Sequence, residues 1–203
     1  MKKYSIIYAD PPWSYRNGKG HPRWAAEVTN HYSTMTLEDI KSLPVQGLAD
    51  ENCMLFMWVT FPNLKEGLET IDSWGFKYKT LAFSWLKLDS RFAETLLKLL
   101  KKIDGKDGVL EIIQKLFFFG VGYYTKSNCE VCLIGVKGKP IKESNRVSSV
   151  LLAPRGKHSE KPPIVRDKII ELCGDIPRVE LFARQATPGW DVWGNEVAST
   201  IEL

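Results

Sequence analysis

Tyr4-Ser5-Ile6-Ile7-Tyr8-Ala9-Asp10-Pro11-Pro12-Trp13, close to the start of the chain, is the stretch around which the other segments can be arranged. Residues 4–9 are mostly apolar, aromatic or β-branched, which is typical of a strand buried on both faces. The strand must end at Asp10, because Pro11 and Pro12 lack backbone donors and have a fixed φ. Ligands of open α/β sheets bind at the carboxyl ends of the strands. The stretch therefore predicts a rigid turn that brings a carboxylate and an indole to a binding site.

This turn suits the methylation of an exocyclic amine on a base ring. Such an amine is a poor nucleophile, because its lone pair is delocalised into the ring. The Asp10 carboxylate and a carbonyl of the Pro11-Pro12 turn can accept its two hydrogens and favour a tetrahedral nitrogen, which can attack a methyl sulfonium. Trp13 would stack on the ring. The alternative, a proline turn with a capping Asp and no chemistry, stays open on these four residues alone.

Length and composition predict a single domain over residues 1–203. The chain is 44% hydrophobic and 26% charged, as is ordinary for a globular protein. Its longest apolar runs are strand-sized and no signal peptide opens the chain, so we expect no membrane association and a cytoplasmic or nucleoid-associated protein. Four cysteines suggest a reducing compartment. Cys129 and Cys132 form a lone C-x-x-C without a second ligand pair, which predicts strand residues and no metal site.

Basic residues are concentrated in two segments. Residues 137–161 hold seven Lys or Arg against two Glu, and residues 14–31 hold three against one. Since the net charge is +4, the remainder is acidic by three charges. This distribution predicts a groove for a polyanion, although two solvated loops would carry the same charges. The candidate substrate-binding residues are Arg16, His31, Tyr32, Arg155 and Lys157, which combine cations for phosphates with rings for bases.

The other segments continue an α/β pattern. Strands are predicted at residues 53–60, 80–87, 129–136 and 178–184, and helices at residues 36–43, 62–74 and 162–173. Residues 89–118 have helical spacing broken by glycines, which predicts a helical hairpin inserted between two strands. At the end of the chain, Arg184, Asn195 and Glu196 could bind the hydroxyls or ring nitrogens of a nucleoside.

Several motifs together resemble the MT-A70 family of S-adenosylmethionine-dependent adenine-N6 methyltransferases, over nearly the whole chain except residues 89–118. In chain order the motifs are Asp10-Pro11-Pro12-Trp13, His31-Tyr32-Ser33-Thr34-Met35, Leu55-Phe56-Met57-Trp58-Val59-Thr60, Glu130-Val131-Cys132-Leu133-Ile134-Gly135-Val136-Lys137-Gly138, Ser159-Glu160-Lys161-Pro162, Glu180-Leu181-Phe182-Ala183-Arg184 and Gly194-Asn195-Glu196. Their agreement in order is far more specific than any one of them.

The resemblance implies an α/β fold, a Rossmann-like methyltransferase sheet with permuted motif order and helices on both faces. It implies that Asp10 and Pro11 hold the target amine and that Trp13 and Tyr32 flank the target base. S-adenosyl-L-methionine would be the cofactor. Ser159 and Lys161, from one motif, would bind the cofactor, with Lys161 at its carboxylate. Phe182 would lie beside its adenine. The ribose would be held by Arg184, Asn195 and Glu196.

We expect adenine-N6 methylation of nucleic acid, with DNA favoured and RNA as the alternative. A non-catalytic nucleic-acid-binding subunit with the same fold is a different class of explanation. Asp10 and Lys161 argue against it, because a degenerate platform has no chemical reason to keep them. A cytosine-N4 methylase would use similar amine chemistry, and only the family resemblance disfavours it.

Overall fold

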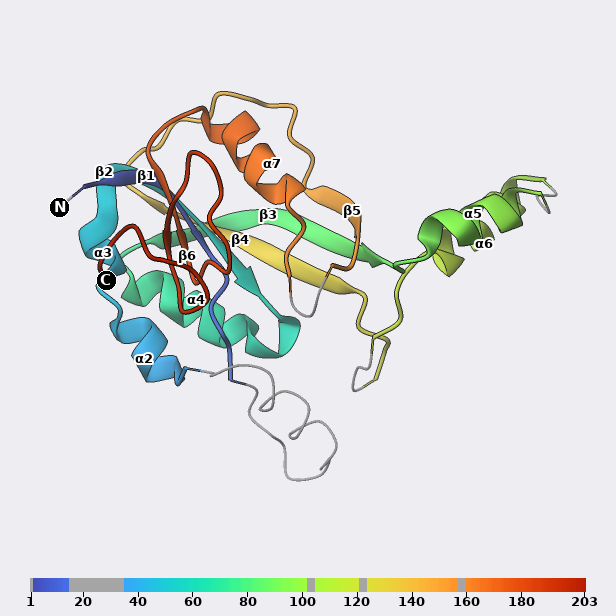
Figure 1. Ribbon diagram of the computed structural model, residues 1–203, viewed down its shortest axis with the longest axis horizontal. Coiled ribbons are helices and arrows are strands. Elements are labelled where there is room, and N and C mark those ends of the chain that lie inside the picture. The colour runs from blue at the N-terminus through green and yellow to red at the C-terminus, as the bar shows by residue number, and fades with distance from the viewer. Residues whose placement is uncertain (1, 15–34, 102–104, 121–123, 157–159) are drawn as a thin grey trace.

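The computed structural model describes residues 2–14, 35–101, 105–120, 124–156 and 160–203, and these form a seven-stranded sheet with helices on its two faces (Figure 1). The strands are β1 Tyr4–Ala9, β2 Ala49–Val59, β3 Lys77–Leu88, β4 Cys129–Lys137, β5 Val150–Pro154, β6 Arg178–Leu181 and β7 Asp191–Trp193. The helices are α2 Leu37–Ser42, α3 Val45–Leu48, α4 Leu64–Ser73, α5 Phe92–Leu100, α6 Gly105–Lys115 and α7 Ile164–Cys173, with a 3-10 turn η1 at Phe61–Asn63.

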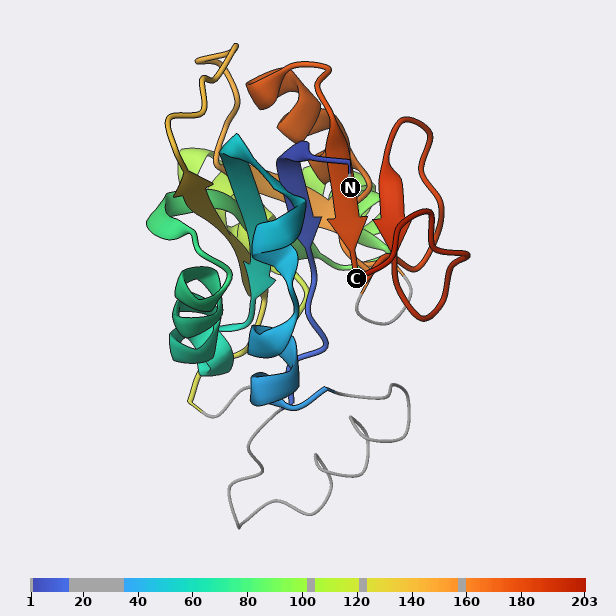
Figure 2. The same ribbon diagram turned by 90° about the vertical axis from the view of Figure 1, so that its left-hand side faces the viewer.

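The strands lie in the order β5-β3-β4-β2-β1-β6-β7, and their directions define two ends of the sheet. β4 is antiparallel to β2 and β3, and every other pair is parallel. Figure 2 shows β2, β1, β6 and β7 pointing the same way. Six strands therefore end where β4 begins, and we call this the carboxyl end of the sheet. The turn after β1, the segment before α7 and the segments after β6 and β7 all lie there.

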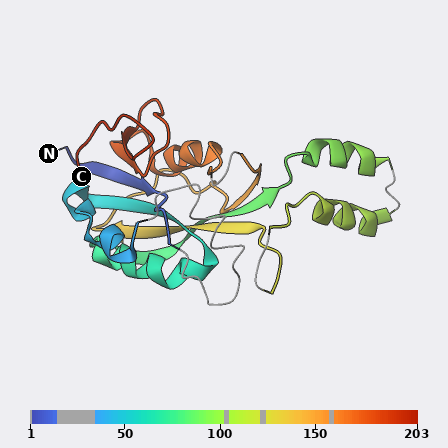
Figure 3. The ribbon, with the colours of Figure 1, turned by 60° about the horizontal axis from the view of Figure 1, so that its bottom comes forward.

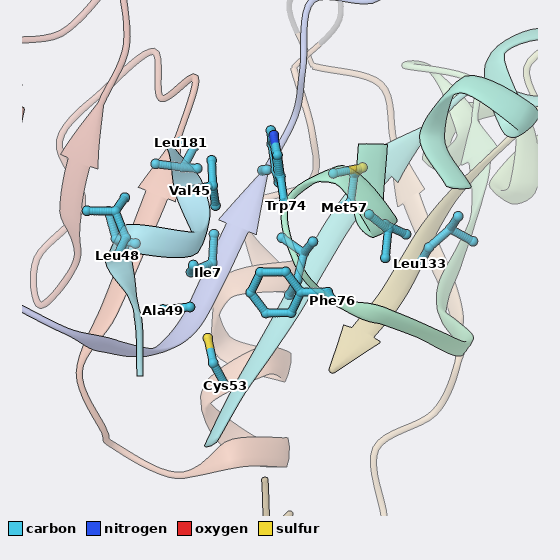
Figure 4. Packing of buried hydrophobic residues seen from close by; sticks show 14 of the residues in the cluster. Ile7, Val45, Leu48, Ala49, Cys53, Met57, Trp74, Phe76, Leu133 and Leu181 are labelled. Atoms are coloured by element: carbon cyan, nitrogen blue, oxygen red, sulfur yellow. The ribbon is translucent and has the colours of Figure 1, made fainter. Parts of the chain in front are cut away.

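β1 is buried on both faces, as its composition predicts. Tyr4, Ile7 and Ala9 belong to one hydrophobic cluster, while Ile6 and Tyr8 belong to the other. Figure 4 shows the first cluster, in which Ile7 lies with Phe76, Trp74 and Leu181. Because β1 contributes to both cores, the start of the turn at Asp10 is fixed by packing on two sides.

Helices cover both faces, as the resemblance implies. Figure 3 shows α7 on one side of the sheet and α2 and α4 on the other. α2 begins at a capping box, since the Thr36 side chain accepts from the Asp39 amide and Asp39 accepts from the Thr36 amide. α7 ends at Gly174, whose φ of 89° favours glycine. The expected Rossmann-like α/β architecture is confirmed.

The insertion between β3 and β4 projects from the body as the helical hairpin α5–α6 (Figures 1 and 3). No residue of α5 is buried, and Leu97 and Leu110 are 65% and 62% exposed. The hairpin is joined to the body at its base, where Phe118 donates its amide hydrogen to the Lys87 carbonyl. It therefore adds no layer over the sheet.

Several details differ from the sequence prediction. The short strands β5 and β7 and the one-turn helix α3 were missed, because three to five residues give too little periodicity to detect. Residues 137–161, which were predicted to form a polyanion groove together with residues 14–31, do not all lie at one end of the sheet. Lys137 lies opposite Cys53 at the amino end of the sheet, and β5 then carries the chain back to the carboxyl end. Among the described residues of this segment, Lys161 contacts Asp10 of the turn.

Candidate active site

The turn after β1 is held from beneath by Trp13. Its indole N–H donates to the Trp58 carbonyl at 2.9 Å, and the side chain is only 7% exposed. The Trp13 amide donates to the Pro11 carbonyl at 2.8 Å, which closes the turn. Pro11 keeps a second lone pair for another donor. Trp13 thus anchors the turn in the core, and the stacking role predicted for it has little exposed ring surface to act through.

Asp10 is paired with Lys161, which comes from the segment before α7. Lys161 Nζ lies 2.8 Å from Asp10 Oδ2 and 3.3 Å from Glu130 Oε2. The other oxygen of Glu130, Oε1, accepts a hydrogen bond from Lys87 Nζ. All four side chains are mostly buried, with 12% to 24% of each exposed. The two lysines and two carboxylates form a neutral row, which we call the charge row.

The charge row sets the ionisation of its members. Burial raises the pKa of Asp10, and the nearby Lys161 ammonium opposes that rise. Burial alone would raise the pKa of Glu130 as well, but Lys161 and Lys87 hold it below its ordinary value. Burial would lower the pKa of Lys161, yet Asp10 and Glu130 hold it above its ordinary value. Lys161 therefore stays charged at neutral pH and favours an ionised Asp10.

A second polar network lies under the site. Arg166 of α7 makes two hydrogen bonds of 2.7 Å with the carboxylate of Glu180 on β6. Glu180 is next to Tyr8 in the β1–β6 register, and the Tyr8 hydroxyl accepts from the Trp58 indole at 2.7 Å. Tyr8 and Trp58 are each about fully buried, and burial strongly raises the pKa of Tyr8. One pair joins α7 to β6 and the other joins β1 to β2, and the Arg166 guanidinium lies 5.8 Å from the centroid of the Tyr8 ring.

The residues predicted to hold the cofactor ribose come together after β6 and β7. Arg184 Nε lies 3.7 Å from Glu196 Oε1, and the charge of Arg184 also acts on Asp10. A Cβ at Gly194 would collide with the backbone of Ala183, so glycine permits this close approach. Phe182 has a φ of 60°, which is uncommon for a residue with a side chain, and its ring meets Trp193 edge-on at 5.4 Å. Asn195 is exposed at the same place.

Several predicted site residues are placed apart from this group or are outside the described part of the chain. Arg155 is exposed, and its guanidinium lies 3.4 Å from the centroid of the Phe118 ring at the base of the hairpin. Arg16, His31, Tyr32, Lys157 and Ser159 lie outside the described residues. Their predicted roles stay predictions.

Sequence reasoning missed the role of Glu130 and Lys87. Both sit in apolar strands, and a charged residue inside such a strand is the signal that could have drawn attention to them. It also missed the Arg166–Glu180 pair, whose members are separated by a helix and a turn. Among the described residues there is no group of three His, Cys, Asp or Glu side chains that could hold a metal ion, and no helix that could cross a membrane.

The fold is that of a Rossmann-like α/β protein, and comparison with known proteins identifies its class as a methyltransferase. The MT-A70 family model matches residues 4–102 and 111–196. The chain is 32% identical over 212 residues to the type II methyltransferase M.MunI of Mycoplasma sp, covering 97% of this chain and 78% of that protein. The chain therefore belongs to the MT-A70 family, as its motifs suggested.

Other relatives carry names that describe adenine chemistry. The human N(6)-adenine-specific methyltransferase METTL4 is 29% identical over 97% of this chain and 38% of its own length. The human N(6)-adenosine-methyltransferase catalytic subunit METTL3 is 25% identical over 97% of this chain and 29% of its own length. The chain thus spans well under half of these two relatives, but most of M.MunI.

Proposed function

We propose that this protein transfers the methyl group of S-adenosylmethionine to N6 of adenine in DNA. The observation that carries the proposal is the difference between the two carboxylate oxygens of Asp10 at the end of β1. Lys161 binds Oδ2, and in the part of the chain that the structure describes no side chain donates a hydrogen bond to Oδ1. One carboxylate oxygen is thus held in place, and the other can accept a hydrogen from an incoming amine.

The turn supplies two acceptors for the two hydrogens of the adenine amine. Oδ1 of Asp10 takes one hydrogen, and the second lone pair of the Pro11 carbonyl takes the other. Both acceptors draw the nitrogen toward tetrahedral geometry and free its lone pair. The lone pair is then available to the electrophilic methyl that S-adenosylmethionine would supply. The N6 proton passes to Asp10 and on to solvent.

The residues present fit S-adenosylmethionine by their chemistry. When bound, this group supplies an electrophilic methyl on a sulfonium. Lys161 offers an ammonium to its carboxylate, while Arg184, Asn195 and Glu196 offer donors and acceptors to its ribose hydroxyls. These residues are gathered at the carboxyl end of the sheet, where α/β proteins bind their ligands.

DNA is favoured over RNA because M.MunI, a relative that aligns with most of both chains, is a type II DNA methyltransferase. The relative named for adenosine aligns over 29% of its length. The adenine must be extruded from a duplex, or already be unpaired, before its amine can reach Asp10. RNA is the alternative substrate, and the experiment below includes it.

The test is incubation of the purified protein with S-adenosylmethionine and adenine-containing duplex DNA, single-stranded DNA or RNA, followed by nucleoside mass spectrometry. We expect N6-methyladenine in DNA. N4-methylcytosine would overturn the choice of base, and methylation of RNA alone would overturn the choice of nucleic acid. Asp10→Asn is the matched control, since it keeps the shape of the turn and removes the charge.

A further inference from the structure

The charge row crosses four neighbouring strands at the carboxyl end of the sheet. Lys87 is near the end of β3, Glu130 is near the start of β4, and Asp10 directly follows β1. Lys161 lies over the ring of Trp58 on β2, with its ammonium 5.6 Å from the ring centroid. The charges alternate from plus to minus along the row. Two cations and two anions cancel, so no member is left buried with an uncompensated charge.

Lys161 is shared unequally between two carboxylates. It lies 2.8 Å from Asp10 but 3.3 Å from Glu130. Lys87 occupies the other oxygen of Glu130. A carboxylate that already binds one ammonium attracts a second one less strongly, because part of its charge is compensated. Lys87 therefore weakens the hold of Glu130 on Lys161, and Lys161 stays closer to Asp10.

Lys87 is itself held firmly. Its amide donates to the Asn128 carbonyl at 2.8 Å, and its carbonyl accepts from the Phe118 amide at 2.8 Å. Its ammonium lies 5.0 Å from the centroid of the Trp85 ring. A side chain that is fixed at its backbone and at its ammonium can hold Glu130 in one position.

We propose that Lys87 and Glu130 are positioning residues that set how Lys161 is divided between Glu130 and Asp10, and so keep Oδ1 of Asp10 aimed at the substrate amine. This inference rests on the proposed function for its catalytic consequence only. Without Lys87, Glu130 attracts Lys161 fully and draws it away from Asp10. Without the charge of Glu130, Lys161 binds Asp10 more tightly, which makes the carboxylate a poorer acceptor for the amine.

The first test needs no activity. The ammonium ¹⁵N resonance of Lys161 is recorded in the protein without ligands, after assignment with Lys161→Arg. We expect Lys87→Met to shift this resonance even though Lys87 does not contact Lys161, and Glu130→Gln to shift it as well. Lys87→Arg, which keeps a cation beside Glu130, should give a resonance near the wild-type position. An unchanged resonance in Lys87→Met would overturn the coupling, whether or not the protein methylates adenine.

The second test separates positioning from general damage. We expect Lys87→Met and Glu130→Gln each to lower kcat by about tenfold or more, the size of effect that coupled neighbours produce. Lys87→Arg should restore most of kcat. Cofactor affinity, measured by calorimetry, should not fall in Glu130→Gln, because removing a negative charge beside Lys161 favours an incoming carboxylate.

Lys77→Met is the matched control, since Lys77 is exposed at the opposite end of β3. It should change neither kcat nor the Lys161 resonance. Equal losses of kcat, cofactor affinity and melting temperature in Lys87→Met and Lys87→Arg would show a merely structural role and overturn the proposal. A shifted Lys161 resonance in a protein that methylates no nucleic acid would instead leave the positioning intact and reject the proposed function.

Discussion

At the scale of single residues, Asp10 carries the proposed chemistry. Asp10→Asn should keep the fold, because the amide has the same shape and Trp13 still anchors the turn at the Trp58 carbonyl. Turnover should fall by at least about a hundredfold, the usual cost of losing one preorganised polar contact at a reacting centre. Methyl transfer under single-turnover conditions, with a melting curve as the control for folding, measures this. Wild-type turnover in the variant would remove Asp10 from the mechanism.

Glu130 makes a prediction about pH. Its pKa is lower in the folded protein than the ordinary value of 4.5, because Lys161 and Lys87 outweigh the effect of burial. The sign follows from linkage: its ionised form adds stability above that ordinary pKa, and the contribution is lost as pH falls through the lower folded-state pKa. The difference in unfolding free energy between wild type and Glu130→Gln should therefore be largest near neutral pH and shrink in acid. Denaturant unfolding at several pH values measures it, and a constant difference would contradict the assignment.

The residue scale also shows where sequence reasoning reaches its limit. Asp10 and its turn could be predicted, because two prolines after a buried strand dictate local geometry. The sequence analysis assigned Lys161 to the cofactor and did not predict its ion pair with Asp10. The two residues lie 2.8 Å apart in the structure but are separated by 150 residues in the chain. The pairing of Lys87 with Glu130 depends in the same way on β3 lying beside β4. Contacts between distant segments depend on strand order, which motifs alone do not give.

At the scale of elements, the Arg166–Glu180 pair ties α7 to β6. Their side chains are 11% and 8% exposed, and burial raises the pKa of Glu180 despite the nearby Arg166. Arg166→Met should leave this carboxylate buried without its cation and lower the unfolding free energy by about 3–5 kcal/mol. Chemical denaturation measures the loss.

The double variant Arg166→Met/Glu180→Leu is the control for this pair. It removes both charges, and an apolar replacement of a buried ion pair is often close to neutral. We expect it to recover most of the stability lost in Arg166→Met. If the double variant is no more stable than the single one, lost packing of the Arg166 stem explains the effect and the ion pair does not.

The α5–α6 hairpin should be dispensable for the fold. No residue of α5 is buried, and Ile112 of α6, which is buried, belongs to neither of the two hydrophobic clusters of the body. The family model leaves residues 103–110 unmatched. Replacing residues 93–114 with a short Gly-Ser linker should change the melting temperature by no more than about 4 °C, which corresponds to about 1 kcal/mol in a chain of this size. Ile7→Ala, in the core, should cost about 2–5 kcal/mol and serves as the contrast. A collapse of the sheet on shortening the hairpin would contradict this.

The element scale separates what periodicity can predict from what it cannot. The elements β1, β2, β4, α4 and α7 lie where continuous apolar runs and helical spacing predict them, although β2 starts four residues before the predicted strand. β6 is shorter than predicted, because Phe182 adopts a positive φ and ends the strand after Leu181. β5 was missed because its apolar run, Val150 to Ala153, is only four residues long and lies within the basic segment.

At the scale of the whole molecule, the directions of β4 and β5 place the basic residues of 137–161 at opposite ends of the sheet. β4 runs away from the turn after β1, so Lys137 and Lys139 are at the amino end of the sheet. There the Lys139 amide donates to the Asn52 side chain. β5 returns the chain to the carboxyl end, and Arg155 follows it there. The net charge of +4 therefore says less about a nucleic-acid surface than the position of individual cations does.

Two pairs of basic residues with the same total charge are therefore expected to contribute differently to DNA binding. Arg155→Ala/Lys157→Ala removes two cations from the segment that leads to Lys161, whereas Lys139→Ala/Arg146→Ala removes two from the loop between β4 and β5. If Arg155 and Lys157 contact phosphates, the first variant should weaken DNA binding equally for every DNA sequence. The slope of log affinity against log salt concentration should fall by about two phosphate contacts. The second should leave the slope unchanged, because its exposed side chains belong to the other end of the sheet. Fluorescence anisotropy over a series of salt concentrations measures both slopes. Equal slopes for the two variants would show that binding follows net charge alone, and a flatter slope only in the second would place the DNA at the amino end of the sheet, away from Asp10.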